Sequence, residues 1–306
     1  MIKTLSEMKF ITILYSLLML SLTAFSQNIT SGFSSPESVA SNGKRFFVSN
    51  IGPGKNKIAR DSDGFISEIF PNGKIKTKHF LPTTGVMHSP HGLVVIKNML
   101  YVADEDKVQG FNINSRAKVF DVSTGTKTGL LNDIEKINDS LLVVSDIFKD
   151  VIYCINLHTK SISDIGHVPG PNGLLYDATN NLLYVCTVGH HSNGQGKLFV
   201  KSGFKSKNEW KLVSGSPDSG VFDGIAFLDS DHILISDWIT YPSSKGRLFV
   251  YSLKNRSYIS YPLKSPEPAD MYVDKNSHDI FLPQTAKDRV IIFKTNDLKN
   301  KKLERL

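Results

Sequence analysis

The sequence predicts an all-β protein, folded as one six-bladed β-propeller with four-stranded blades. One motif recurs six times, at intervals of 40 to 54 residues, which suits a blade of four strands. No segment shows sustained helical periodicity, so a parallel α/β fold, which needs helices between its strands, is disfavoured. The six repeats cover residues 36–48, 90–102, 131–143, 171–185, 222–235 and 268–282.

Each repeat contains two hydrophobic strands separated by a short polar turn, and further strands follow it. The segments 197–200 and 247–251 are nearly identical to each other, and pairs such as Asn42-Gly43 indicate the turns. The sixth repeat supplies three clear strands, which end at 289–294. We expect its fourth strand to come from either 28–33 or the C-terminal tail, because joining the chain ends in one blade closes the ring.

The first 26 residues have the features of a signal peptide. Lys3 and Lys9 form a positively charged region before an apolar run over 10–22, which is short for a membrane span. Small residues occupy the expected cleavage positions. No Cys follows, so lipid anchoring at that site is excluded. An uncleaved membrane anchor is the alternative. The expectation is therefore an exported protein, periplasmic or secreted, with a single domain over 27–306 and no membrane span after cleavage.

Charge and cysteine content exclude several classes of function. The formal net charge is +7, but the basic residues are scattered and only 299–305 is dense, without interleaved aromatics, so we do not expect nucleic-acid binding. Cys154 and Cys186 both lie in apolar strand-like runs. An oxidising compartment permits a disulfide between them, and two buried free thiols are equally ordinary.

One aligned position carries most of the functional signal: the residue that opens each innermost strand, which we call the slot. Five of the six slot residues are polar: Glu37, His91, Asn132, Asn172, Asp223 and, as the exception, Ala269. Innermost strands line the channel of a propeller and start at the same mouth, so these side chains should converge, with Asp133 beside them. The competing interpretation is turn chemistry, because Asn and Asp favour turns and each slot follows a loop.

Four of the slot residues form a plausible set of metal ligands. Carboxylates and carboxamides are the ligands that Ca²⁺ prefers, although another divalent cation is possible. Several histidines or thiolates would instead have indicated zinc. The candidate ligands are Glu37, Asn132, Asn172 and Asp223.

The slot motifs resemble those of the six-bladed lactonase superfamily, which includes the senescence-marker/gluconolactonase (regucalcin-like) family and the paraoxonases. The resemblance implies that the four candidate ligands hold a catalytic Ca²⁺. The runs 89–93 and 131–134 are closer to the paraoxonase versions, in which the histidine, here His91, belongs to the active site. The second paraoxonase histidine is missing, and Gly224 after the late aspartate is closer to the gluconolactonase pattern.

Two functions follow from these observations. The first is a metal-dependent hydrolase of a lactone or related small-molecule ester, in which His91 or Asp223 accepts a proton from the attacking water. The second is a non-catalytic, NHL-like propeller that binds a sugar, peptide or envelope protein partner, with the slot residues forming turns or a structural ion site. In either case Trp210, Trp238 and Tyr241 are candidates for an aromatic wall. The histidine pair at 190–191 could contact substrate or belong to a solvated loop.

Overall fold

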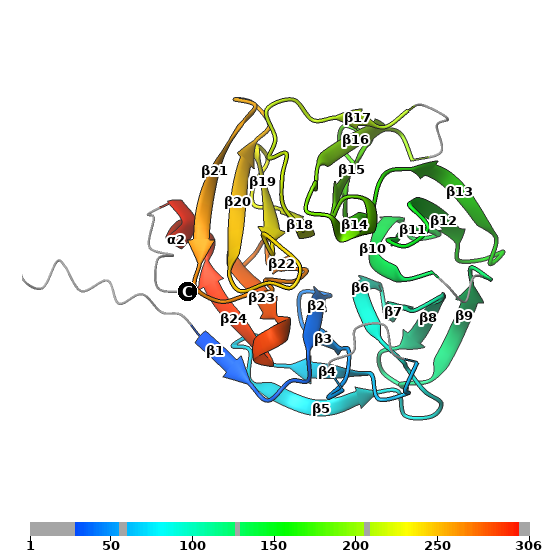
Figure 1. Ribbon diagram of the computed structural model, residues 1–306. Helices are drawn as coiled ribbons and strands as arrows, with labels where there is room; N and C mark the ends of the chain where they lie inside the picture. Colours follow the sequence, from blue (N-terminus) through cyan, green and yellow to red (C-terminus); the bar gives the residue numbers. More distant parts are fainter. Residues whose placement is uncertain (1–27, 55–59, 126–128, 205–208, 300–306) are drawn as a thin grey trace, which may run out of the picture.

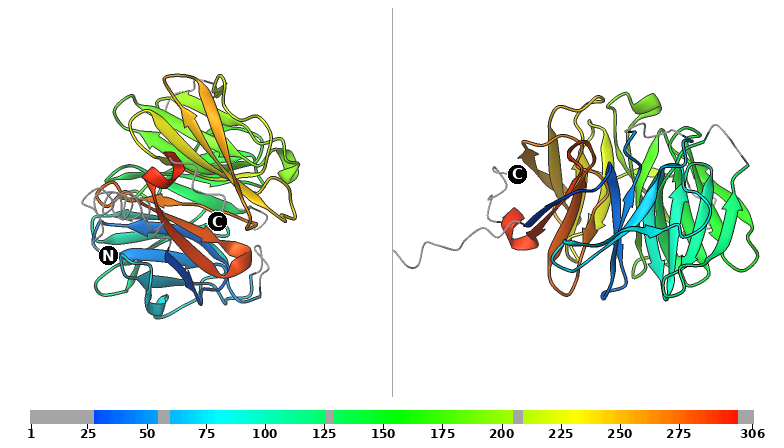
Figure 2. Two further views of the ribbon diagram at one scale, coloured as in Figure 1. Left: turned by 90° about the vertical axis from the view of Figure 1, so that its left-hand side faces the viewer. Right: turned by 90° about the horizontal axis from the view of Figure 1, so that it is seen from below.

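A computed structural model describes residues 28–54, 60–125, 129–204 and 209–299 of the chain. These residues form six four-stranded antiparallel sheets that follow one another around a central axis (Figure 1). Two views from the side show the sheets packed face to face as neighbouring blades (Figure 2). The predicted six-bladed β-propeller is confirmed.

The blades follow the six sequence repeats in order. Blade 1 comprises β2 (Pro36–Ser41), β3 (Phe46–Asn50), β4 (Phe65–Ile69) and β5 (Ile75–Leu81). Blade 2 comprises β6 (Pro90–Ile96), β7 (Met99–Asp104), β8 (Lys107–Asn112) and β9 (Lys118–Ser123). Blade 3 comprises β10 (Leu131–Asn138), β11 (Leu141–Asp146), β12 (Val151–Asn156) and β13 (Ile162–His167).

The second half of the ring repeats this order. Blade 4 comprises β14 (Pro171–Asp177), β15 (Leu182–Thr187), β16 (Leu198–Ser202) and β17 (Lys211–Leu212), with the 3-10 helix η1 (His190–Ser192) between β15 and β16. Blade 5 comprises β18 (Phe222–Phe227), β19 (His232–Asp237), β20 (Gly246–Ser252) and β21 (Ser257–Leu263). Blade 6 comprises β22 (Tyr272–Val273), β23 (Asp279–Gln284), β24 (Arg289–Lys294) and β1 (Asn28–Ser31), with η2 (Thr285–Lys287) before β24 and the helix α2 (Thr295–Lys299) after it.

Blade 6 closes the ring with a strand from the other end of the chain. β1 pairs antiparallel with β24, in the register Asn28↔Ile292 to Ser31↔Arg289, and forms the outer edge of the blade. Of the two segments expected to close the ring, the N-terminal one is therefore used. After β24 the chain turns into α2, and Leu298 of this helix is buried against the core of blades 5 and 6.

The core lies between neighbouring blades, where the second strands are buried almost completely. Between blades 1 and 2, for example, Phe47, Leu100 and Val102 belong to one buried cluster. Burying a side chain of this kind stabilises the fold by about 1.5–3 kcal/mol. This burial explains why the second strand is the most apolar part of each repeat.

A β-bulge at the start of the innermost strand redirects the slot residue in five of the six blades. Strand pairing skips from the residue before the slot to two residues after it, as between Leu131 and Ile134 in blade 3. The amide that the bulge removes from the ladder is satisfied by a serine of the second strand: the amide of Asp133 donates to Ser145 Oγ at 3.0 Å. Because bulges redirect side chains, the repeat places each slot residue at the mouth of the channel.

Close approach of the innermost strands explains the small residue after several slots. A Cβ added to Gly173 would lie 2.4 Å from the carbonyl oxygen of Asp223 in the next blade, so only glycine fits there. Cys186 packs at the same point and its thiol donates to that carbonyl at 3.1 Å. Cys154 and Cys186 are buried thiols that are not bonded to each other.

Within the described residues, no helix is both long enough and apolar enough to cross a membrane. The predicted signal peptide over 1–26 and most of the basic segment 299–305 lie outside the described residues.

Candidate functional site

A cavity of about 360 Å³ lies at the mouth of the channel where the innermost strands begin. Five slot residues contribute to its wall, each from a different blade, and the sixth slot residue, Ala269, is buried elsewhere. The five are Glu37, His91, Asn132, Asn172 and Asp223. The structure thus brings together four oxygen-bearing side chains and an imidazole from positions up to 186 residues apart in the chain.

Asn172, at the start of β14, has the most informative hydrogen bonds of the five. Its Nδ2 donates to the carbonyl of Phe222 and to Asp223 Oδ1, both at 3.1 Å, which fixes the orientation of the amide. The side chain is only 4% exposed, and its Oδ1 has no hydrogen-bond partner within the described part of the chain. A buried acceptor without a partner costs about 1–3 kcal/mol, so this oxygen marks a position suited to a cation or a donor from a ligand.

Glu37, in β2, is held by a residue of the last blade. Thr285 Oγ1 lies 3.0 Å from Glu37 Oε2 and 2.9 Å from the carbonyl of Pro36, and both side chains are buried. Thr285 belongs to η2, so the blade without a polar slot residue still supports the site. Thr285 was not among the predicted site residues, because it lies beyond the end of the sixth repeat at 268–282.

His91, in β6, has a defined tautomer in its neutral form. Its Nδ1 is 2.6 Å from the carbonyl of Ser89, which can only accept, so Nδ1 carries the proton and Nε2 is unprotonated. The amide of Ser89 in turn donates to Asp104 Oδ1 at 2.8 Å. The imidazole is therefore oriented by the loop that precedes its own strand.

Asp133, expected beside the ligand set, does not line this cavity. Its two carboxylate oxygens accept the amides of Ile134 at 2.7 Å and Leu174 at 2.6 Å, which ties blade 3 to blade 4. Burial is the main reason that its pKa is raised to about 6, and the charge of Glu37 adds to the rise. Asp133 lines a second cavity of about 260 Å³ at the opposite mouth of the channel.

Asp270 is a further buried acid and was not among the predicted site residues. It follows Ala269 as Asp133 follows Asn132, so the alignment of repeats already contained this signal. Ser38 Oγ donates to Asp270 Oδ2, and burial raises the pKa of Asp270 well above the usual range. Asp270 also lines the opposite cavity.

Blades 3 to 5 contribute an apolar wall to the site cavity. Trp238 and Tyr241 are part of it, with ring centroids 6.0 Å apart in a stacked arrangement. The remaining apolar lining residues are Leu130, Ile147, Phe148, Val188 and Val221. Trp210 does not line the cavity, and packs instead beside Lys201.

The loop with the histidine pair reaches the cavity through Ser192 alone. His190 and His191 are exposed, and His190 Nδ1 lies 3.0 Å from Asp150 Oδ2 in the neighbouring blade. Of the two interpretations of this pair, the structure favours a solvated loop.

A second column of polar residues, at the ends of the second strands, holds the loops of this face. We call it the clamp column; its members are Asn50, Asp104, Asp146, Thr187, Asp237 and Gln284. Asp237 Oδ1 accepts the amides of Val221 and Ile239, both at 2.8 Å, and its Oδ2 accepts from Arg247. Asp146 Oδ1 accepts three amides, while its buried Oδ2 has no partner among the described residues.

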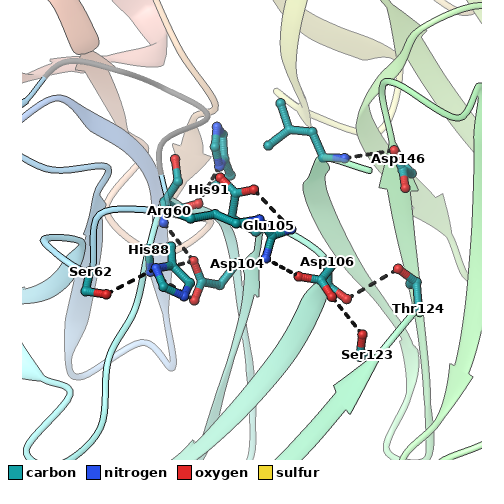
Figure 3. Close-up of polar contacts among 12 residues, drawn as sticks. Arg60, Ser62, His88, His91, Asp104, Glu105, Asp106, Ser123, Thr124 and Asp146 are labelled. Carbon is teal, nitrogen blue, oxygen red and sulfur yellow. Dashed lines mark hydrogen bonds and ion pairs between the residues drawn. The ribbon is translucent and has the colours of Figure 1, made fainter. Parts of the chain in front are cut away.

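In blade 2 the clamp residue Asp104 is followed by two more acids that meet an arginine of blade 1 (Figure 3). Arg60 Nη1 lies 2.7 Å from Asp106 Oδ1, and Nη2 lies 3.5 Å from Glu105 Oε2. Burial raises the pKa of Glu105 to about 7, and Arg60 opposes this rise. The Glu105 carbonyl accepts the amide of Leu131, so this turn also positions the residue before Asn132.

The donor set resembles neither a zinc site nor an all-acid cluster. Within the described ranges, no three His, Cys, Asp or Glu side chains are grouped so that they could hold a metal ion. The candidate ligands are two carboxylates and two carboxamides, which all coordinate metal ions through oxygen. The Asn172 carboxamide oxygen is buried and has no hydrogen-bond partner within the described residues. This chemistry suits a hard cation such as Ca²⁺.

No known family description matches this chain, and no curated protein matches it in sequence. Its fold is similar to that of a gluconolactonase from Xanthomonas campestris, with a TM-score of 0.66 and 12% sequence identity. The superposition covers 91% of this chain and 92% of the gluconolactonase. A protein of unknown function from Bacteroides thetaiotaomicron has a TM-score of 0.62 and 12% identity over 88% of this chain and 76% of its own. Hydrazine synthase from Kuenenia stuttgartiensis has a TM-score of 0.58 and 12% identity, over 89% of this chain and 80% of its own. At such identities the similarity establishes a shared propeller fold, one that a lactonase also uses.

Proposed function

We propose that this protein is a divalent-cation-dependent hydrolase of a lactone or related ester, with Ca²⁺ as the expected ion. The observation that carries the proposal is the buried Asn172 oxygen without a partner, in a cavity that three further oxygen-bearing slot residues also line. Turn chemistry alone does not explain why four blades contribute such groups to the wall of one cavity. The fold shared with a gluconolactonase supports the reaction class.

Glu37, Asn132, Asn172 and Asp223 would hold the ion. A bound Ca²⁺ would polarise the substrate carbonyl and stabilise the negative charge that develops on its oxygen. The chain supports this arrangement before any ion binds. The Asn172 amide is fixed by Phe222 and Asp223, and Thr285 holds the Glu37 carboxylate.

His91 is the better of the two candidate proton acceptors. In the neutral ring Nδ1–H is committed to the Ser89 carbonyl, so Nε2 carries the basic lone pair, and His91 lines the cavity. Asp223 Oδ1 already accepts a hydrogen bond from Asn172, which supports a ligand role for Asp223 rather than a role as base. The apolar wall lowers the local water content and so strengthens charge interactions at the polar side.

The proposal is tested with a panel of aldonolactones, homoserine lactones and aryl esters, assayed with Ca²⁺ and with a chelator. We expect turnover by the wild type with Ca²⁺ only, and loss of turnover in Asn172→Ala and Asp223→Ala. His91→Gln should lower kcat by about 10²–10⁴ while Ca²⁺ binding persists. His190→Gln is the matched control, because this histidine is exposed and does not line the cavity. Turnover that is unchanged in all the cavity variants would contradict the proposal.

The second candidate function is a binding propeller without catalysis. The exposed aromatic rim formed by Phe148 and Tyr241 supports a binding role, because such a rim suits ligand capture and does not itself require a reaction. Ca²⁺ binding without turnover of any compound in the panel would support this candidate over the hydrolase. Export of the chain, based on residues 1–26, stays a prediction.

A further inference from the structure

The site cavity has an apolar side next to its polar slot residues, and the position that follows the clamp residue forms part of this side in three of the six blades. In blades 1, 2 and 6 this position holds Ile51, Glu105 and Thr285, which are buried and do not line the cavity. In blades 3, 4 and 5 it is apolar and lines the cavity, as Ile147, Val188 and Trp238. Three consecutive blades thus face the cavity with hydrocarbon, although their loops differ in length and sequence.

The residues of the apolar side are packed against one another. Val188, Val221 and Trp238 form one buried cluster, and Ile147 packs against it. Trp238 Nε1 donates to the carbonyl of Pro268 at 3.0 Å, so the indole cannot rotate freely and its polar atom is already satisfied. The wall is therefore preformed and offers little hydrogen bonding to a ligand.

Two large apolar side chains extend this wall to the surface. Phe148 is 50% exposed and Tyr241 is 60% exposed, and both line the cavity at its rim. Exposed aromatic groups beside a cavity are costly in water and typical of ligand contact. Among the wall residues of blades 3 to 5 away from the slots, only Ser192 and the Tyr241 hydroxyl offer polar side-chain atoms.

This division selects between substrates that share a carbonyl. A polyhydroxylated sugar lactone would place hydroxyl groups against the wall, where they lose hydration without gaining partners, at a cost of about 1–3 kcal/mol each. An alkyl or aryl substituent would gain by leaving water there. We propose that the substrate carries an apolar substituent, held by Phe148, Trp238 and Tyr241, with its carbonyl directed to the slot residues.

This inference rests on the proposed hydrolase, and it differs from what the similar gluconolactonase acts on. The first test compares kcat/KM for γ-lactones with progressively longer alkyl substituents against an aldonolactone. We expect a rise of about threefold to fourfold per added methylene until the wall is covered. Phe148→Ser and Tyr241→Ser should flatten this rise, because they should lower kcat/KM more for the long-chain lactones than for the unsubstituted lactone. Tyr258→Ser is the matched control, because Tyr258 is an exposed aromatic (43%) on β21 that does not line the cavity.

A second test needs no turnover. The chain has two tryptophans, so Trp210→Phe leaves Trp238 as its only indole. Titration with γ-lactams, which are hydrolytically inert, should change Trp238 fluorescence with a Kd that falls as the alkyl group lengthens. Phe148→Ser should weaken the long-chain lactam about tenfold and the short-chain one little.

The two tests separate the inference from the hydrolase. Chain-length-dependent lactam binding without turnover of the matching lactones would support the apolar binding site and overturn the hydrolase. Turnover that favours the aldonolactone, or that ignores chain length, would overturn the inference and leave the hydrolase standing. Lactam binding that is independent of chain length would also overturn the inference.

Discussion

Two columns of Asn, Asp and similar residues run around the same face of this propeller, and they are used differently. In the clamp column, Asp104 accepts the amides of His88 and Ser89 and the side chain of Gln109, so both of its oxygens are committed to the fold. In the slot column, Asn172 uses its nitrogen for the fold and presents a buried oxygen without a partner within the described residues.

The comparison teaches that residue type does not separate a structural acid or amide from a candidate ligand. Both columns are buried, repeat once per blade and lie beside loops. Composition and spacing therefore cannot distinguish the residues that hold loops from the candidate ligands. What differs is that the five polar slot residues line the cavity and no clamp residue does, while clamp oxygens such as those of Asp104 accept loop amides. The predictions below test that difference.

The largest expected effect is the loss of a clamp residue. Asp237→Ala leaves two loop amides and the Arg247 guanidinium without their buried partner, so we expect a loss of about 3–5 kcal/mol in the free energy of unfolding. Asn172→Ala removes a slot residue with two hydrogen bonds and should cost only about 1–2 kcal/mol without metal. Urea denaturation in the presence of a chelator measures both, and equal losses would remove the distinction between the columns.

The acid that follows the clamp in blade 2 should make stability depend on pH. The pKa of Glu105 is raised to about 7 because the carboxyl is buried, so the folded state binds its proton more tightly than the unfolded state. Stability is therefore lost as the pH rises from about 4.5 through about 7. We expect Glu105→Gln, which cannot ionise, to be about 2 kcal/mol more stable than the wild type at pH 8.5 and equal to it at pH 4.

Urea denaturation of the two proteins at both pH values checks this prediction. Asp139→Asn is a suitable control, because Asp139 is an exposed acid in ion pairs with Lys97 and Lys136. A Glu105→Gln variant whose stability relative to the wild type does not change with pH would contradict the account of this turn.

A smaller effect is expected at Thr285, which is not a slot residue but contacts the candidate ligand Glu37. Thr285→Val removes the hydroxyl contact with Glu37 and should cost about 1 kcal/mol of stability. It should also weaken Ca²⁺ binding by about tenfold or more, because partners of metal ligands orient them. Calorimetric titration with Ca²⁺ measures the affinity, and Thr285→Ser should restore it. An affinity unchanged by Thr285→Val would show that Glu37 does not depend on this contact.

Much of the fold was predictable, because the propeller repeats one local pattern six times. Apolar second strands and turns recur at blade spacing, as does a polar residue at the start of five of the six innermost strands, and the same periodicity placed these five slot residues on one cavity. Closure by the segment that contains β1 was left open against the C-terminal tail. The choice depends on pairing between Asn28 and Ile292, which no local pattern encodes.

The residues that were not predicted lie outside the repeated pattern, or lie in the repeats at positions other than the slot. Thr285 and Arg60 lie in loops of variable length, and their contacts join positions far apart in sequence. Asp270 aligns with Asp133 in the repeats, but the apolar slot residue before it, Ala269, gave no reason to include the sixth repeat in the site. The roles of Asp104 and Asp237 could not be inferred from sequence, because a clamp and a ligand need the same kind of oxygen.

The most direct test of the central claim is the effect of Ca²⁺ on thermal unfolding, measured for the wild type and for Asn172→Ala. An ion that binds only the folded state at 100 times its Kd adds about 2.7 kcal/mol of stability. The account predicts a clear rise in the wild-type Tm with Ca²⁺, its reversal by a chelator and little or no rise in Asn172→Ala. A wild-type Tm that does not respond to Ca²⁺ or any other divalent cation, or an equal rise in the variant, would contradict it.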